Sequence, residues 1–305
     1  VLVAAGAEEA IFIFMNVILN AGDNIIVHTP CYQSLTEIAV SIGAEVTHWT
    51  ASYDKGWSLD IDFLEKSIKP NTRAVVVNCP HNPTGYQMSL QDYQRVVDIC
   101  RKNNLFLFSD EVYKLLDYGE GPEGQNSLPS ACDLYEKGIS LGVMSKSFGL
   151  AGLRIGWVVC KDRELFAKLA SYKDYTSICN SAPSEYLSIV ALQKKNILIA
   201  RTKEIVSTNV KLVDDFFNRH KKYFSWVKPS HGPISFPKLS NEFESVNVEA
   251  FCEDLLKKKG VLLLPGTCYS FGSQYFRLGL GRKNVAEALQ KLEEYIKEGN
   301  LDKLL

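Results

Sequence analysis

Residues 142–157 read Gly-Val-Met-Ser-Lys-Ser-Phe-Gly-Leu-Ala-Gly-Leu-Arg-Ile-Gly-Trp, and this stretch decides the fold. Lys146 lies between two serines, in a run whose other members are mostly apolar or glycine. A lysine in such a loop is either an incidental surface charge or an amine whose pKa is lowered by loss of water. An amine of the second kind can act as a nucleophile or form a Schiff base. Gly149 and Gly152 favour the second interpretation, because they let the backbone turn and approach a ligand closely.

The same loop carries a guanidinium. Arg154 opens the apolar run Ile-Gly-Trp-Val-Val, which is typical of a strand. An amine and a fork-shaped guanidinium on one loop suit a cofactor that has both a carbonyl and a phosphate. The run from Ser145 to Trp157 resembles the cofactor-lysine signature of the class I/II aminotransferases, the fold-type I enzymes that use pyridoxal 5'-phosphate (PLP). The resemblance implies that Lys146 forms the Schiff base with PLP and that Ser145 and Arg154 hold its phosphate.

The chain departs from the family pattern at one position in this loop. Family members often carry a second phosphate-binding hydroxyl three residues before the lysine, and this chain has Val143 there. The departure removes one hydrogen bond to the phosphate. We therefore expect Arg154 and the turn at Gly6 to matter more for phosphate binding.

A strand, a glycine and a helix follow one another at the start of the chain. The apolar run Val1–Ala5 ends at Gly6, and an apolar-periodic helix with an acidic first turn extends to about Leu19. Such a junction directs free backbone N–H groups and the positive end of the helix outward, which makes an anion site. An ordinary strand-to-helix turn has the same pattern. The resemblance implies that the amides of Gly6, Ala7 and Glu8 bind the phosphate.

An aromatic residue follows the next predicted strand. The strand Asp23–Thr29 ends at Pro30, and Tyr32 comes just after it. The carboxyl end of a strand faces the usual ligand crevice of an open α/β sheet. A lone tyrosine at the rim, with its hydroxyl in water, fits the pattern as well. The resemblance implies that the Tyr32 ring stacks on the pyridine of PLP.

An asparagine occupies a turn after the buried strand predicted at Arg73–Asn78. The turn contains Asn82-Pro-Thr-Gly, in which Pro83 and Gly85 are explained by turn chemistry alone. Asn82 falls at the crevice, where its amide can donate to a phenolate oxygen. The resemblance implies that Asn82 binds the cofactor 3'-oxygen and lies beside the substrate carboxylate.

Acidic and phenolic side chains end the strand predicted at Leu105–Ser109. Asp110, Glu111 and Tyr113 follow it directly. A carboxylate at the end of a buried strand is costly unless it meets a cation. A helix cap is the alternative role for Asp110, and a solvated or structural acid is the interpretation we prefer for Glu111. The resemblance implies that Asp110 binds the protonated pyridine nitrogen and that Tyr113 binds the 3'-oxygen.

An arginine interrupts an apolar strand near the end of the chain. Arg277 lies within Tyr-Phe-Arg-Leu-Gly-Leu, and an arginine inside a strand is rare unless it meets an anion. A surface arginine on an edge strand is the other interpretation. The resemblance implies that Arg277 binds the substrate α-carboxylate with both arms of its guanidinium.

The order of predicted elements indicates an α/β protein in which strands and helices alternate. We predict a fold-type I PLP-dependent transferase with a large, mainly parallel α/β/α sheet domain over residues 1–185. Residues 186–305 are predicted to form an interdomain helix and a smaller C-terminal α+β domain. A long amphipathic run from Ser184 predicts the helix, and residues 261–264 are predicted to form a strand of the second domain. Residues 118–130 are rich in Gly, Pro, Ser and Asn and are predicted to form a loop over the site.

Composition limits the partners. Thirty-four basic and thirty-five acidic residues leave a net charge of −1, so no bulk field attracts nucleic acid or an anionic membrane. The longest apolar run is too short to span a bilayer. Eight scattered cysteines show neither metal-site nor disulfide spacing, and no metal is expected. We predict a cytoplasmic homodimer that acts on amino acid and 2-oxo acid substrates.

The sequence starts without Met, and we expect that the chain lacks N-terminal residues.

These motifs together predict an aminotransferase that moves an amino group from an amino acid to a 2-oxo acid through Lys146. Lys146, Asp110 and Tyr113 are the predicted catalytic residues. A C-S β-lyase or a cyclase would use the same residues and differ only in the fate of the carbanion. A non-catalytic PLP-binding protein is a further alternative, which the presence of Lys146, Asp110 and Arg277 disfavours.

Overall fold

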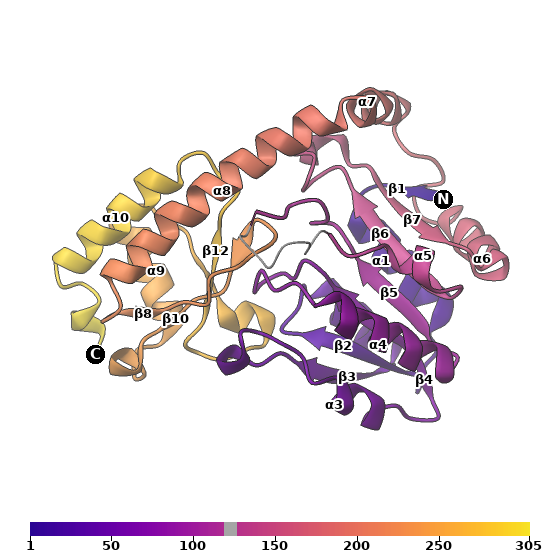
Figure 1. The fold of residues 1–305 in the computed structure, drawn as a ribbon, viewed down its shortest axis with the longest axis horizontal. Coiled ribbons are helices and arrows are strands. Elements are labelled where there is room, and N and C mark those ends of the chain that lie inside the picture. Colours follow the sequence, from indigo (N-terminus) through magenta and orange to yellow (C-terminus); the bar gives the residue numbers. More distant parts are fainter. Residues whose placement is uncertain (119–126) are drawn as a thin grey trace.

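The computed structural model describes residues 1–118 and 127–305, and its largest element is a seven-stranded sheet (Figure 1). The strand order is β1-β7-β6-β5-β4-β2-β3. Strands β3, β2, β4, β5 and β6 run parallel to one another, whereas β7 is antiparallel to both β1 and β6. The bounds are β1 (Leu2–Ala4), β2 (Asn24–Thr29), β3 (Glu45–Thr50), β4 (Thr72–Asn78), β5 (Phe106–Asp110), β6 (Gly138–Val143) and β7 (Gly156–Cys160). The predicted mainly parallel sheet is confirmed.

Both faces of this sheet are covered by helices. Helices α1 (Ala7–Ile18), α2 (Ser34–Ile42) and α6 (Arg163–Lys173) pack on one face, and α3 (Ile61–Lys66), α4 (Leu90–Lys102) and α5 (Ala131–Leu134) pack on the other. Strand β4 shows why two layers form. Its side chains alternate, so Ala74 and Val76 enter one core while Val75 and Val77 enter the other. A strand that is apolar on both faces must be buried on both.

Local signals set the helix ends. Ser89 caps α4, where its hydroxyl accepts a hydrogen bond from the Asp92 N–H at 3.0 Å. Asp162 caps α6 in the same way. Gly43 ends α2 with φ +87°, a left-handed conformation that glycine adopts without steric cost. Each cap supplies a partner to backbone groups that the helix leaves unpaired, which is worth roughly 1 kcal/mol.

A long helical segment joins the sheet to the second lobe. One amphipathic run from Ser184 was predicted, but the structure divides it at Lys194 into α7 (Ala182–Gln193) and α8 (Lys195–Arg219). Lys194 has φ −109° and ψ 20°, outside the helical region, and ends α7. Helix α8 then runs from the large sheet to the second lobe (Figure 1). The predicted domain boundary at 185/186 falls inside α7 and stays a prediction.

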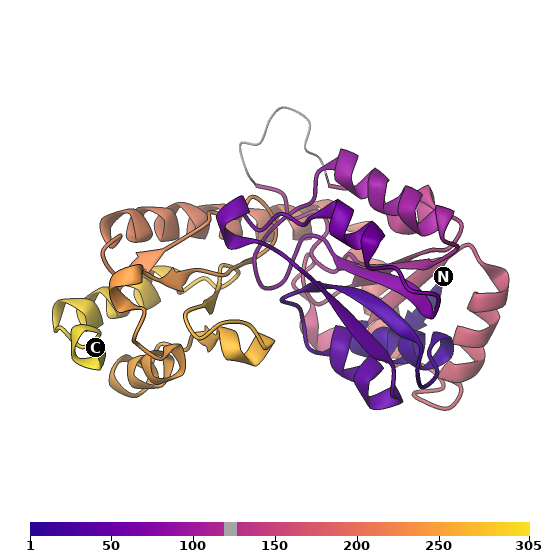
Figure 2. The same cartoon turned by 90° about the horizontal axis from the view of Figure 1, so that it is seen from below.

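The second lobe has its own hydrophobic core, formed by buried side chains from Val206 onward. Short strands and two helices enclose it: β8 (Phe224–Ser225), β9 (Ile234–Ser235), β10 (Lys238–Leu239), β11 (Leu264–Pro265), β12 (Phe276–Gly279), α9 (Val248–Lys259) and α10 (Val285–Lys297). Single-turn helices lie at η1 (Tyr53–Lys55), η2 (Ala151–Leu153), η3 (Asn241–Phe243), η4 (Gly266–Tyr269) and η5 (Asp302–Leu304). The predicted strand at 261–264 is reduced to β11, in which Pro265 is paired with Phe276. Figure 2 shows the two lobes side by side, with the chain ends on opposite lobes.

Most of the loop predicted at residues 118–130 lies outside the described residues. No helix in the described part of the chain is long and apolar enough to cross a membrane. Within residues 1–118 and 127–305, no group of three His, Cys, Asp or Glu side chains is placed to hold a metal ion. All eight cysteines are unpaired in the structure as described.

Candidate active site

A cavity of about 240 Å³ lies where the carboxyl ends of the parallel strands meet the second lobe. Its lining includes every predicted site residue except Gly6, which lies beside it. The lining residues are Ala7, Glu8, Ile11, Tyr32, Asn78, Asn82, Asp110, Val112, Tyr113, Val143, Ser145, Lys146, Ala151, Arg154 and Arg277. The parallel sheet explains the convergence, because β2, β4 and β5 end at the same edge. Residues far apart in sequence therefore share one site.

Lys146 follows β6 and has an environment that disfavours its charge. Burial lowers the pKa of its amine, and the Arg277 and Arg154 guanidinium groups lower it further, while Asp110 acts in the opposite direction. Its Nζ lies 5.8 Å from the centroid of the Tyr113 ring. An amine with a lowered pKa spends more time unprotonated, which is what a nucleophile needs.

Gly6, Arg154 and Ser145 form one end of the site, here called the phosphate corner. Gly6 has φ +89°, and a Cβ atom there would lie 2.5 Å from Arg154 Nη2. A side chain at position 6 would therefore displace the guanidinium. Ser145 Oγ is buried and has no hydrogen-bond partner among residues 1–118 and 127–305. A buried hydroxyl without a hydrogen-bond partner can donate to a ligand. Because it lies with a guanidinium and the start of α1, an anionic ligand suits the site.

Asp110 lies at the end of β5 and is 4% exposed. Burial raises the pKa of its carboxyl to about 7, although the Val112 N–H, which donates to Oδ1 at 3.2 Å, and the Lys146 amine lower it. The carboxyl makes no ion pair within the described part of the chain. The helix-cap alternative fails because no helix follows it directly. A cationic ring nitrogen would supply the missing partner.

The two predicted tyrosines lie in different surroundings. Tyr113 is 4% exposed, and burial raises the pKa of its hydroxyl. Tyr32 precedes α2 and is 44% exposed, so its ring is available to a flat ligand. Burial of the Tyr32 hydroxyl and the charge of the Glu8 carboxylate raise its pKa. Ser34 also donates to the Glu8 carboxylate, so the Glu8 side chain is held on the Tyr32 side of the cavity.

Arg277, Asn82 and Tyr269 form the opposite end, here called the carboxylate corner. Arg277 Nη1 donates to Asn82 Oδ1 at 3.4 Å, and the Tyr269 hydroxyl donates to the same oxygen at 3.4 Å. The Arg277 guanidinium carbon lies 5.9 Å from the centroid of the Tyr269 ring. Because these donors occupy the Asn82 oxygen, the amide nitrogen is left for a ligand. Sequence reasoning missed Tyr269, whose only signal was its place in the turn after Pro265.

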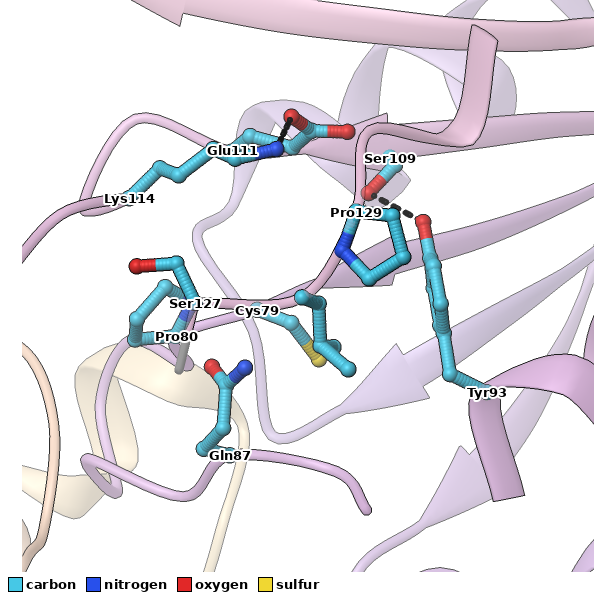
Figure 3. Close-up of a pocket in the computed structure, with 10 residues that line it drawn as sticks. Cys79, Pro80, Gln87, Tyr93, Ser109, Glu111, Lys114, Ser127 and Pro129 are labelled. Atoms are coloured by element: carbon cyan, nitrogen blue, oxygen red, sulfur yellow. Dashed lines mark hydrogen bonds and ion pairs between the residues drawn. The ribbon is translucent and has the colours of Figure 1, made fainter. Parts of the chain in front are cut away.

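Glu111 does not line this cavity; it lines a second, smaller pocket, where it pairs with Lys114 (Figure 3). It is 8% exposed, and its oxygens accept from Ser140 Oγ at 2.8 Å, the Ala131 N–H at 3.0 Å and Lys114 Nζ at 3.0 Å. The adjoining space is only about 10 Å³, room for one water molecule. Glu111 is therefore a structural acid, as preferred from the sequence.

The residues present fit PLP. The unpartnered Ser145 hydroxyl, Arg154 and the start of α1 are suited to a phosphate. The buried Asp110 carboxyl is suited to a ring cation, and the Lys146 amine faces the same cavity. The site therefore offers a suitable group to each part of PLP: hydrogen-bond donors to its phosphate, a carboxyl to its ring nitrogen and an amine to its carbonyl. The roles of the individual residues remain predictions.

Comparison with known proteins agrees with this chemistry. Residues 1–292 match the protein family described as aminotransferase class I and II. The chain is 26% identical to an aspartate aminotransferase from Sulfolobus acidocaldarius, over 98% of this chain and 75% of that protein. It is 29% identical to a capreomycidine synthase from Streptomyces vinaceus, over 88% of this chain and 67% of that protein.

The fold has close counterparts among solved structures. A PLP-dependent aminotransferase from Streptococcus suis superimposes with a TM-score of 0.89 at 30% identity, over 97% of this chain and 76% of that one. The family match spans both lobes and includes the lysine loop and Arg277. This chain belongs to the class I and II aminotransferases, PLP-dependent enzymes of fold type I that transfer amino groups.

Proposed function

We propose that Lys146 carries the transamination catalysed by this chain, as the amine that bonds to PLP and moves the substrate α-proton. One observation supports this most directly: the Lys146 amine, the buried Asp110 carboxyl and the Arg277 guanidinium all face one cavity. These are an amine, an acid and an anion-binding group, which transfer of an amino group from an amino acid requires. No other cavity described here combines them.

Lys146 is proposed to have two tasks. Its lowered pKa favours the unprotonated amine, which is the form that attacks a carbonyl carbon. Once displaced from that carbon by the substrate amine, Lys146 Nζ can accept the α-proton as a general base and later return it. When bound, PLP supplies a ring that accepts the electrons released at the substrate α-carbon.

The neighbouring residues are proposed to hold the cofactor and the substrate in place. Asp110 would hold a proton on the ring nitrogen, because its buried carboxylate needs a cation. Tyr113 and the Asn82 amide would donate to the 3'-oxygen, and Tyr32 would stack on the ring. Gly6, Ala7 and Glu8 would bind the phosphate through their amides, together with Ser145 and Arg154. Arg277, beside Asn82, would bind the substrate α-carboxylate.

Borohydride reduction followed by peptide mapping tests the role of Lys146. Reduction fixes the cofactor to the amine that holds it, and we expect the adduct on Lys146 alone. Lys137, which does not line this cavity and donates to Asn104 at 2.7 Å, is an internal control that should stay unmodified. An adduct on another lysine, or on none, would overturn the assignment.

A product assay separates transamination from the lyase and cyclase alternatives. One relative is named a synthase rather than an aminotransferase, which supports considering a reaction other than transamination. Transamination yields a 2-oxo acid and converts an added 2-oxo acid into an amino acid. A lyase or cyclase would instead consume substrate without any 2-oxo acid acceptor.

We propose a homodimer whose contact surface includes helix α7. Tyr186, Leu187, Ile189 and Val190 on this helix are 68%, 51%, 55% and 41% exposed. Apolar side chains gathered in this way are typical of an association surface. Sedimentation should give a dimer, and Ile189→Lys should dissociate it. A fully active wild-type monomer would refute this.

We also propose a cytoplasmic location. The support is the cysteine chemistry: all eight thiols are free in the described structure, and most are buried. Unpaired cysteines of this number are typical of a reducing compartment. Fractionation of cells that express the tagged chain tests this, and recovery from an oxidising compartment would contradict it.

A further inference from the structure

Glu9 and Lys173 form a buried ion pair beside the phosphate corner. Lys173 Nζ lies 3.6 Å from Glu9 Oε2, and the two side chains are 7% and 11% exposed. Glu9 belongs to the first turn of α1, and Lys173 is the last residue of α6. Lysine and glutamate are almost never this buried unless they are paired, and the pair costs desolvation energy. Neither side chain lines the cavity, so direct contact with the cofactor does not explain the pair.

The Glu9 carboxylate joins two segments of backbone. Its Oε2 accepts from the Ala5 N–H at 2.6 Å. Its Oε1 accepts from Thr176 Oγ1 at 2.6 Å and from the Ser177 N–H at 3.1 Å. Burial raises the pKa of Glu9, but the bonds from Ala5, Thr176 and Ser177, with the charge of Lys173, lower it to about 2. The carboxylate is therefore ionised at neutral pH.

Lys173 is satisfied in the same cluster. Its ammonium donates to Ser177 Oγ as well as facing Glu9. The loop after α6 is thus tied to the first turn of α1 by charge and by hydrogen bonds from both ends. Ile178 in this loop has φ 59°, which a β-branched residue adopts only when its surroundings fix it.

The attachment point at Ala5 is next to the phosphate turn. Gly6 follows directly, and its N–H donates to the Ala4 carbonyl at 2.8 Å. The position of Gly6 also decides where Arg154 can lie, because there is no room for a Cβ atom between them. A carboxylate that holds the Ala5 N–H therefore holds the turn whose amides start α1.

We propose that Glu9 and Lys173 are a positioning pair that fixes the Gly6 turn for the cofactor phosphate. Glu9 holds the turn, and Lys173 neutralises a carboxylate that would otherwise compete with the phosphate for the positive end of α1. The proposal rests on the phosphate-binding role of this corner proposed above. It assigns a function to two residues that the reaction itself does not use.

Cofactor titrations of the apoenzyme test the pair. Glu9→Gln leaves a buried ammonium without a counter-charge, and Lys173→Met leaves a buried carboxylate near the phosphate. We expect each change to raise the apparent PLP dissociation constant about tenfold, which corresponds to 1.4 kcal/mol. Pyridoxal, which lacks the phosphate, should lose less than about twofold, because a group that acts through the phosphate turn does not affect it. The double variant Glu9→Gln/Lys173→Met should bind PLP better than either single variant, since neither charge is then unpaired.

Glu164→Gln is the matched control. Glu164 pairs with Lys168 on the same helix, and its side chain is 81% exposed, so the same charge change should leave PLP affinity unaltered. A purely structural pair would lower the melting temperature of the apoenzyme but leave both dissociation constants at the wild-type value, and that result would overturn the proposal. Equal losses for PLP and pyridoxal would overturn it too.

A milder variant covers the case in which Glu9→Gln does not fold. Thr176→Val removes one hydrogen bond to Glu9 and no charge, and it should raise the PLP constant about threefold without affecting pyridoxal. No change in this variant would count against the pair. Failure of the wild-type enzyme to bind PLP at Lys146 would instead refute the proposed function, so the two failures are distinguishable.

Discussion

The phosphate corner and the carboxylate corner are built in different ways. Gly6, Ser145 and Arg154 all come from the large sheet and its loops, and Gly6 and Arg154 constrain each other's position. The carboxylate corner instead joins Asn82, at the end of β4, to Arg277 on β12 in the second lobe. The hydrogen bonds that Asn82 Oδ1 accepts from Arg277 and Tyr269 are both 3.4 Å long.

This difference predicts that cofactor binding and substrate binding can be altered separately. A change of angle between the lobes would leave the phosphate corner intact but move Arg277 relative to Asn82. Long, weak hydrogen bonds of 3.4 Å also leave the guanidinium free to exchange Asn82 for a carboxylate. We therefore expect substitutions in one corner to affect PLP affinity, and substitutions in the other to affect substrate affinity.

The largest effect is expected at Asp110, between the two corners. Its carboxyl has a pKa of about 7 in the folded chain against 3.8 as the reference value. The folded apoenzyme therefore binds more protons than the unfolded chain between these values, and its stability falls as the pH rises from 4 to 7. The loss from this group is roughly 4 kcal/mol.

Asp110→Asn should abolish that pH dependence. Urea unfolding of both apoenzymes at pH 4 and pH 8 measures it, with the variant the more stable of the two at pH 8. PLP should stabilise the wild type more than the variant, because only the wild type offers the ring cation a carboxylate. If the free energy of unfolding depended on pH in the same way for both proteins, ionisation of Asp110 would not destabilise the fold, and the prediction would be wrong.

Arg277→Lys tests the carboxylate corner. Lysine keeps the charge but loses the planar fork that matches a carboxylate, so the KM for amino acids should rise roughly 10- to 100-fold. PLP affinity and the visible absorbance of the bound cofactor should persist. Half-transamination rates against amino-acid concentration and a cofactor titration measure the two effects. Loss of the cofactor, or unaltered substrate affinity, would make Arg277 a structural strand residue.

The phosphate corner was predictable because its signals are local in sequence. Each motif can be recognised from a short stretch of sequence: one is the run from Ser145 to Arg154, and the other is the glycine at the strand-to-helix junction near residue 6. The alternation of buried strands with helices predicted the sheet for the same reason. The role proposed for Glu9 could not be predicted from the sequence. Glu9 is one of two acids in the first turn of α1, and only the fold shows that Lys173 lies opposite it.

The carboxylate corner was predicted only in part. Arg277 was recognisable as an arginine inside an apolar strand, but nothing in the sequence brings Tyr269 to Asn82, which lies 187 positions earlier. The same limit explains the single long helix predicted from Ser184. The helical pattern in the sequence continues past residue 194, whereas the structure breaks the helix there, at backbone angles outside the helical region. Contacts between distant segments are set by the fold.

Tyr269→Phe sharpens the comparison with a smaller effect. The variant keeps the ring over Arg277 but loses the hydroxyl that donates to Asn82 Oδ1. Because one neutral hydrogen bond is lost, the KM for both amino acid and 2-oxo acid should rise about fivefold. The PLP dissociation constant should not change, since Tyr269 belongs to the carboxylate corner and not to the phosphate corner. An effect on kcat with no effect on KM would contradict a role in positioning Arg277.

Val143→Ser is expected to give the smallest effect, and it should improve binding. Val143 lines the cavity three residues before Lys146 and is 4% exposed, so a hydroxyl there would face the same ligand as Ser145. Serine places a hydroxyl where valine has one methyl group and lacks the other methyl, and the added donor can form one hydrogen bond to an anion, which should lower the PLP dissociation constant about threefold. The substrate KM should stay at the wild-type value, because the carboxylate corner is untouched.

Val143→Ala is the control that removes the same methyl groups without adding a donor, and it should bind PLP slightly less well than wild type. If the serine variant instead weakened PLP binding as much as the alanine variant, the hydroxyl would not reach the phosphate, and the phosphate corner would be complete with Ser145, Arg154 and the Gly6 turn.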